Sequence, residues 1–518
     1  MNRPVASRIL RRTPRVGHGV LVVGLVWLLG CGDDQPERTG TDGGMTILLP
    51  RDALELDPRL TGDAYGLKIS RLLFAGLTRV DPVSLEILPY LAERVEILAP
   101  DRYRVRLRSG LQFSDGSQLD SADVEATYRS VVSKTLGSRY ASTYSRIERV
   151  EVTGPLEVTF QLKGPHATFL TDLELPVLRA EDEHSPVAQP GGPAPIGAGP
   201  YVLQSRRPGH LVLAANPHWH VGQPRFPKVR LRVIRDDNTR ALRLIAGAGD
   251  LVLNAMPPLL QPMFEGRPGF LVKAERGLGT TYLGINTGSR VLADERVRRA
   301  LAHAIDRKRI IATKLAGRAA PATSWVPPGH WAHVEDLPQY EYDPERARSL
   351  LADAGYADGL ELTLRTGGDR FRRSMARVLA AMLGEVGVRV RIRTTEVASM
   401  IADLNRGHFE LTLLEFPELL EPHVLSWFFG SDRIPDEHQV GANRWRFANA
   451  PLDAALERGR TTTDLVERKR AYRQVQQILA RKLPVIPLWH ADMVAVSGSR
   501  AHSFVVPRNG RFDTLAFP

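Results

Sequence analysis

Apolar and polar residues alternate with a period of two along several short segments of the chain. The clearest segments are 103–107, 156–162 and 229–233, and arginines fill the polar positions of the first one. Such alternation predicts β-strands with one buried face and one face in water.

The second half of the chain has the spacing of amphipathic helices instead. Val297, Ala300, Leu301 and Ala304 share one face, because they recur at intervals of three and four residues. Three similar apolar stripes cover 347–354, 378–386 and 465–479, and the first follows Asp343-Pro344, which is typical of a helix start. Strands that alternate with helices predict an α/β protein, and no repeat of fixed period is present.

Composition narrows the classes of protein. A chain of 518 residues is long enough for about three domains at ~150 residues each. The single cysteine excludes an intrachain disulfide framework and any cysteine-only zinc or iron–sulfur site. The formal charge is +11, but five arginines lie in the first thirty residues, and the remaining charge is spread among interleaved acids and bases. We therefore expect no nucleic-acid partner.

The N-terminal segment is typical of an export signal. Basic residues occur at positions 3–15 and an apolar run follows at 20–29, too short to span a bilayer core of about 30 Å. The sequence Leu28-Leu29-Gly30-Cys31 then resembles a bacterial lipobox, in which the cysteine is lipidated. We predict a lipoprotein signal peptide at 1–30, a lipid on Cys31 and a flexible polar tether at 31–44. The alternative is a buried free cysteine after an uncleaved anchor.

Motifs of catalysis and of cofactor binding are missing from the sequence. It has no Walker-type glycine loop, HExxH pair, CxxC pair or GxSxG elbow. His218 with His220, and His330 with His333, lack a third ligand nearby, so we expect loop histidines there. We predict no catalytic residues, no metal site and no cofactor. Ligand binding without turnover is the favoured function.

Seven segments, in a fixed order, resemble the family-5 extracellular solute-binding proteins of ABC importers. That family includes the oligopeptide-, dipeptide- and nickel-binding proteins. The segments are LDP (56–58), LFAGLTRVDPVSLEILPYLAE (73–93), GLQFSDGSQLDSADV (110–124), GPY (199–201), LADERVRRALAHAIDRKRI (292–310), YDPERARSLLADAGY (342–356) and LPVIPLWH (483–490).

The resemblance implies a two-lobed, periplasmic-binding-protein-like (type II) α/β fold. The first lobe would comprise residues 45–275, with an extra subdomain at about 80–170. The second lobe would comprise 276–487, and residues 488–518 would return to the first. The chain would cross between the lobes at 281–287 and 486–490.

The implied function is capture of short peptides, or a related small solute, in a cleft between the lobes. The protein would be an exported monomer, anchored by its lipid at the periplasmic or outer face of a membrane, and would deliver the solute to ABC permease subunits. One alternative keeps the fold but makes the protein an envelope sensor or scavenger for a non-peptide solute. Another is a cell-envelope hydrolase, which would need a nucleophile–base pair facing the cleft.

The resemblance also implies candidate ligand-binding residues. In peptide-binding relatives an aspartate in a W-x-x-D-Y-P-D-P segment binds the peptide's ammonium group. The matching segment here is 415–422, where Glu418 takes the aspartate position, Glu421 takes the closing Asp-Pro position and Glu415 replaces the tryptophan. Glu418 would bind a ligand amine; alternatively, the segment is a solvated acidic loop.

Further candidates are less tied to a motif. Arg365 and Arg370 flank the loop expected after 360–364, where relatives can place an arginine that binds a carboxylate; the alternative is a pair of surface arginines. Asn254, Trp427 and Trp489 could form walls of the cleft or belong to the packed core.

Overall fold

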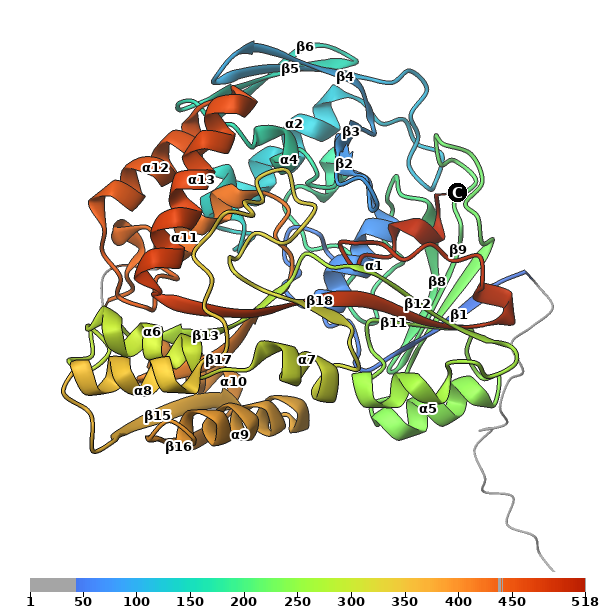
Figure 1. Cartoon of the computed structure of the whole chain (residues 1–518). Coiled ribbons are helices and arrows are strands. Elements are labelled where there is room, and N and C mark those ends of the chain that lie inside the picture. Colours follow the sequence, from blue (N-terminus) through green and yellow to red (C-terminus); the bar gives the residue numbers. More distant parts are fainter. Residues whose placement is uncertain (1–42, 437–438, 440, 518) are drawn as a thin grey trace, which may run out of the picture. The chain divides into compact units, whose positions relative to one another are not determined.

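A computed structural model places one long strand, β18 (Val485–Gly498), between two halves of a 12-stranded sheet (Figure 1). The structure describes residues 43–436, 439 and 441–517, all of which belong to one compact unit. The predicted signal peptide, Cys31 and nearly all of the tether lie outside the described residues. Within the described part, no helix is both long and apolar enough to cross a membrane.

The first half of the sheet is built around β1, which pairs in parallel with β10 and β11. Beyond β10 the neighbours are β9 and β8, both antiparallel, while β11 and β12 pair with β18. The strands of this half are β1 (Met45–Leu49), β8 (Tyr201–Arg207), β9 (His210–Ala215), β10 (Lys228–Val233), β11 (Leu251–Leu253) and β12 (Phe270–Arg276). The helices are α1 (Ala64–Leu73) and α5 (Asp237–Ile245).

A separate four-stranded antiparallel sheet lies within the segment predicted as the extra subdomain. Its order is β4-β5-β7-β6, and α2 packs against β6 and β7. The alternating segments 103–107 and 156–162 are its strands β5 and β7, which confirms that part of the pattern, and Tyr103 pairs with Phe160 on the buried face. The elements here are β2 (Thr78–Val80), β3 (Ile87–Pro89), β4 (Ala92–Ala99), β5 (Arg102–Leu107), α2 (Ser121–Val132), α3 (Ala141–Tyr144), β6 (Ile147–Gly154), β7 (Glu157–Leu162) and α4 (Phe169–Asp172).

The second half of the sheet has the order β16-β15-β17-β13-β18, and β14 also pairs with β18. Its strands are β13 (Thr280–Ile285), β14 (Ala319–Pro321), β15 (Leu360–Gly367), β16 (Val388–Thr395) and β17 (Leu411–Phe416). Its helices are α6 (Glu295–His303), α7 (Arg307–Lys314), α8 (Pro344–Asp353), α9 (Arg370–Gly384), α10 (Val397–Asn405), α11 (Leu425–Phe429), α12 (Ala450–Thr461) and α13 (Leu465–Lys482).

The predicted helix signals are confirmed in this half. The Asp343 side chain accepts a hydrogen bond from the backbone of Arg346, and Pro344 is the first residue of α8. The stripe that begins at Val297 is the buried face of α6.

The hydrophobic cores follow the two halves of the sheet. One large buried cluster joins residues 45–253 with residues 493–516, and two others join residues within 282–489. Two lobes with separate cores are therefore joined through hydrogen bonds of β18, and we call them the first and second lobes.

The chain crosses between the lobes at positions slightly different from those expected. β12 ends at Arg276 and β13 begins at Thr280, so the first crossing is 277–279, before the expected 281–287. In β18 the residues up to Ala491 pair with β13 and β14, and pairing with β12 starts at Asp492. The apolar residues of the two expected segments are buried in the cores of the second lobe. These segments therefore lie inside that lobe, and the chain crosses between the lobes just beside them.

Candidate functional site

An ion-pair network joins the two lobes at the side chain of Arg511. Its Nη1 lies 2.9 Å from Oε1 of Glu174, which follows α4 in the first lobe, and its Nε lies 3.1 Å from Oε1 of Glu418 in the second lobe. The Arg511 side chain is only 5% exposed. One guanidinium thus satisfies a carboxylate from each lobe.

Backbone contacts hold the two carboxylates in place. After β17 the chain turns back on the interlobe crossing, where the Leu419 amide donates to the carbonyl of Leu278 at 3.0 Å. Leu419 itself is fully buried, so the neighbouring Glu418 is held at the lobe boundary. Glu174 accepts a further hydrogen bond, 2.9 Å long, from the backbone amide of Val80.

Lys68 lies beside this network on α1. Its Nζ is 5.4 Å from the centre of the Tyr65 ring and 5.7 Å from that of Phe512. Burial lowers its pKa to about 8, the Glu418 carboxylate opposes this shift, and Arg511 adds to it. Among the described residues Lys68 has no hydrogen bond and no ion pair within 4 Å, so the two rings are the nearest groups that interact with its charge and no carboxylate pairs with it directly.

Two more charged side chains, those of Arg71 and Asp513, lie near the same residues. Arg71 Nη2 is 3.7 Å from Oε2 of Glu174, and burial raises the pKa of Asp513 although Arg511 and Arg71 oppose the shift. Arg71, Glu174 and Asp513 line a cavity of about 30 Å³. We name the six residues Lys68, Arg71, Glu174, Glu418, Arg511 and Asp513 the interlobe cluster.

An aromatic group lies next to Glu418 in sequence, at the end of β17. The half-buried ring of Phe416 stacks on Trp325 at 5.4 Å and meets Phe428 edge-on at 5.2 Å. Glu415, at the position of the family's tryptophan, is reached by solvent, yet crowding by protein atoms raises the pKa of its carboxyl group. The segment thus offers an apolar surface together with two acids.

Glu421 has a different environment, because its carboxylate is paired within the second lobe. Its Oε2 lies 2.7 Å from Nη2 of Arg468, and the two side chains are 11% and 9% exposed. Burial raises the Glu421 pKa more than Arg468 lowers it. The Glu421 carboxylate is therefore paired with a side chain of its own lobe and is not part of the contact between the lobes.

A second contact between the lobes involves the extra subdomain. The Ala167 amide donates to the carbonyl of Arg460 at 3.0 Å, and the ring centres of His166 and His423 are 5.9 Å apart. His166 Nε2 also lies 3.0 Å from Oδ2 of Asp172. Burial lowers the pKa of His423 to about 4, so the neutral imidazole is favoured.

The two candidate arginines lie elsewhere. Strand β15 continues to Gly367, so Arg365 is inside the strand, and its Nη1 pairs with Asp403 Oδ2 at 2.8 Å. The expected loop after 364 is therefore shorter, and Arg370 is the exposed first residue of α9. Neither arginine belongs to the interlobe cluster.

The remaining candidates are also separate from the cluster. Asn254 is exposed and has a positive φ of 48° just after β11. Trp427 is 37% exposed beside Arg433, whose guanidinium carbon is 5.3 Å from the ring centre. Trp489 is 2% exposed in the core of the second lobe, which places it in the core rather than on a cleft wall. Glu418 is thus the one candidate that the structure brings into the cluster.

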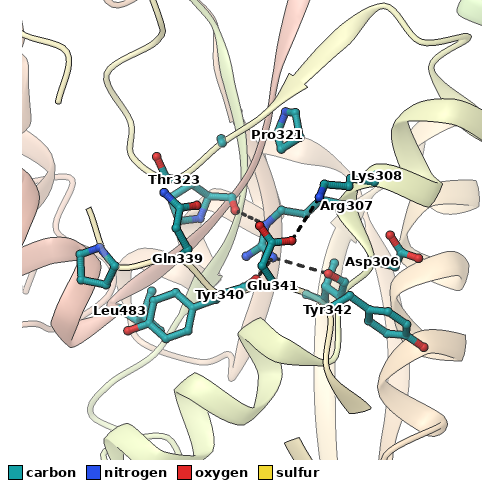
Figure 2. Close-up of a pocket in the computed structure, with 14 residues that line it drawn as sticks. Asp306, Arg307, Lys308, Pro321, Thr323, Gln339, Tyr340, Glu341, Tyr342 and Leu483 are labelled. Atoms are coloured by element: carbon teal, nitrogen blue, oxygen red, sulfur yellow. Dashed lines mark hydrogen bonds and ion pairs between the residues drawn. The ribbon is translucent and has the colours of Figure 1, made fainter. Parts of the chain in front are cut away.

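A pocket of about 70 Å³ lies within the second lobe (Figure 2). Arg307 donates from Nε to the carbonyl of Pro487 and from Nη1 to that of Tyr340, each at 3.0 Å, and Lys308 pairs with Glu341. The charged side chains of Arg307, Lys308 and Glu341, which line this pocket, therefore already have partners within the protein.

His330 and His333, one of the two histidine pairs considered as metal ligands, each lie next to a backbone carbonyl oxygen. The described residues contain no group of three or more His, Cys, Asp or Glu side chains that could hold a metal ion. His330 Nε2 lies 3.0 Å from the carbonyl of Leu420, and His333 Nδ1 lies 2.8 Å from that of Val326.

Comparison with solved structures supports the two-lobed α/β architecture. NikA from Brucella suis, in complex with Fe(III)-EDTA, has a TM-score of 0.82 at 24% identity, covering 91% of this chain and 99% of that one. The oligopeptide-binding protein AppA from Bacillus subtilis, in complex with a nonapeptide, has a TM-score of 0.76 at 23% identity, covering 91% and 98%. The fold is therefore shared along almost the whole length of both structures.

Sequence relatives cover the chain to a similar extent. The di/tripeptide-binding protein 2 of Pseudomonas aeruginosa is 28% identical over 463 residues, covering 81% of this chain and 84% of the relative. The glutathione-binding protein GsiB of Salmonella paratyphi A is 25% identical over 469 residues, covering 88% and 90%. A family model matches residues 86–432, which is more than half of the sequence. On that match, the chain belongs to the bacterial extracellular solute-binding proteins, family 5.

Proposed function

We propose that this protein is the exported receptor of an ABC importer and captures short peptides, or a related small solute, between its two lobes. Similar proteins are named as binding di- and tripeptides, glutathione and oligopeptides, and one solved relative is described as ABC transporter-associated. The lobes and their separate cores supply two surfaces that can enclose a guest.

The position of Glu418 is the observation that carries the proposal. Arg511 occupies its Oε1, while its Oε2 receives no hydrogen bond from the described residues. The side chain is 27% exposed at the lobe boundary. A ligand ammonium group would find a carboxylate oxygen there, and an enclosed ammonium needs such a partner because an unpaired buried charge costs several kcal/mol.

Calorimetric titration of the purified full-length protein in detergent tests this function. We expect saturable binding of a pool of di- to pentapeptides with free ends, and weaker binding of the same pool after N-acetylation. Glu418→Gln should lower the affinity for the free peptides. Glu361→Gln, which changes a carboxylate that pairs with Arg391 on the surface of the same lobe, should leave it unchanged.

Two outcomes would contradict the peptide assignment. One is the absence of peptide binding while Ni(L-His) binds. The other is that mass spectrometry finds a co-purified solute without an amino group.

The lipid anchor forms part of the same proposal. Cys31 is the only cysteine, so radiolabelled palmitate should enter the wild-type protein at that position alone. The variant Cys31→Ala should take up no label and should leave the membrane fraction. Membrane retention of the unlabelled variant would show that residues 20–29 anchor the chain instead.

A further inference from the structure

We propose that Lys68, supported by Arg511, forms an anion subsite of the interlobe cluster that binds a carboxylate group of the captured solute. This inference rests on the proposed function, and it adds a second charge to the ligand besides the amine assigned to Glu418.

The surroundings of Lys68 show that its charge points to the lobe boundary. The Lys68 ammonium lies near the rings of Tyr65 and Phe512, and a Cβ built on Gly510 would come within 3.8 Å of Nζ. Glu418 of the second lobe acts on it electrostatically without making an ion pair within 4 Å. Residues of the first lobe therefore lie around the ammonium group, and a carboxylate of the second lobe is near enough to act on its charge.

The neighbouring cations differ from Lys68 in having carboxylate partners. Arg511 pairs with Glu174 and Glu418, and Arg71 lies within 4 Å of Glu174. In the described part of the structure no carboxylate lies within 4 Å of the Lys68 ammonium group, and Glu418 acts on it only from a greater distance. A partly buried ammonium without a counter-ion is unfavourable, because burial removes its hydration without replacing it by an opposite charge.

A packing role alone does not explain a lysine at this position. A neutral side chain of similar length, such as methionine, could cover the rings of Tyr65 and Phe512 without the cost of a buried charge. The lowered pKa of Lys68 shows the same cost. A ligand carboxylate would remove it by supplying a charge-assisted hydrogen bond.

The ligand chemistry follows from the two sides of the cluster. Among the described residues, Glu418 has a carboxylate oxygen without a hydrogen bond, and Lys68 has an ammonium group with neither a hydrogen bond nor a carboxylate within 4 Å. A solute with both an amine and a carboxylate matches both groups at once. A short peptide with free ends is such a solute.

Calorimetry with Lys68→Met tests the subsite. The probes are a tripeptide pool with free carboxyl ends and the same pool with amidated ends. We expect the variant to lose about 10- to 100-fold in affinity for the free acids and less than about 2-fold for the amides. Lys163→Met, which removes an exposed lysine, is the control and should change neither affinity. Equal losses for both pools, or no loss, would overturn the inference.

If the protein does not bind peptides, the titrations should give a different result. The wild-type protein would then bind neither pool, and organic mono- and dicarboxylates would be titrated against their neutral amides. A wild-type preference for the acids that Lys68→Met abolishes would support the subsite without peptides. A wild-type protein with no preference for acids over amides would refute it.

Thermal unfolding without ligand separates this role from a structural one. Lys68→Met should keep or raise the melting temperature, because it removes an unpaired, partly buried charge. Lys68→Gln provides a second variant with a polar end and no charge. A fall in melting temperature for both variants, in parallel with lost affinity for acids and amides alike, would show that Lys68 acts in folding instead.

Discussion

Glu418 and Glu421 lie in one acidic segment, yet the structure gives them different surroundings. Arg468, the partner of Glu421, lies 47 positions away in the same lobe, whereas Arg511, the partner of Glu418, is 93 positions away and belongs to the first lobe. The sequence could suggest both acids through the family motif. It could not separate them, because the difference lies in partners that only the fold brings near.

The same limit applies to Lys68, Glu174 and Arg511. Glu174 and Arg511 are 337 positions apart, and none of the three belongs to a motif of catalysis or metal binding. Their assembly follows from α1, the segment after α4 and the C-terminal segment meeting beside Glu418. A pattern along the chain contains no such information.

The Glu421–Arg468 pair leads to a prediction about single residues. Arg468→Met should lower the free energy of unfolding by about 3–5 kcal/mol at pH 7, because a buried carboxylate loses its counter-ion. The loss should be smaller at pH 5, since the raised pKa of Glu421 lets it take up a proton. Urea unfolding at both pH values measures the effect. The double variant with Glu421→Gln should recover much of the loss, and an equal loss at both pH values would contradict this account.

At the scale of elements, local sequence patterns predicted whether a segment is a helix or a strand better than they predicted where that element begins and ends. The apolar stripes became the buried faces of α6, α8 and α9, because helix packing follows the spacing of three and four residues. The alternating segments became β5, β7 and β10. The crossings and the end of β15 were misplaced by a few residues, since strand ends depend on partner strands that a local pattern does not reveal.

The first crossing gives a prediction for an element. A Cβ on Gly277 would lie 2.4 Å from the carbonyl oxygen of Ala491, at the point where β18 passes from one lobe to the other. Gly277→Ala should therefore force the backbone apart and cost about 1–3 kcal/mol in urea unfolding. Gly384→Ala is the control, because open space surrounds that glycine in α9, and it should keep or raise stability. An unchanged Gly277→Ala protein would show that the crossing tolerates displacement.

At the scale of the whole molecule, the resemblance predicted the two-lobed fold, while the hydrophobic patterns alone predicted only an α/β protein. The sequence also contained four histidines whose burial could not be foreseen. Burial lowers the pKa to about 4 in each of His220, His330, His423 and His490.

These histidines predict how stability depends on pH. The unfolded chain binds protons near pH 6.5 and the folded protein only near pH 4, so stability is present above pH 6.5 and is lost as the pH falls toward 4. Each fully buried histidine should contribute about 2 kcal/mol of loss by pH 4.5. Urea unfolding from pH 7 to 4.5 measures the slope. Buried acids with raised pKa values, such as Glu421 and Asp513, act in the opposite direction.

A variant of one histidine isolates its share of this slope. His490 is 3% exposed, and its Nδ1 lies 3.0 Å from Oγ1 of Thr280. His490→Gln should flatten the dependence by about 2 kcal/mol over the same range. A slope identical to that of the wild type would exclude His490 as a contributor.

The pairing of β18 with both lobes also decides whether either lobe can exist alone. A fragment that stops before Val485 would expose the edges of β11, β12, β13 and β14 at once, and unpaired strand edges invite aggregation. If β18 were kept in one fragment, the strands of the other fragment would lose the strand with which they pair. The lobes have separate hydrophobic interiors but share this one strand. Dissecting the protein into two autonomous pieces should therefore fail unless each piece carries its own copy of the strand.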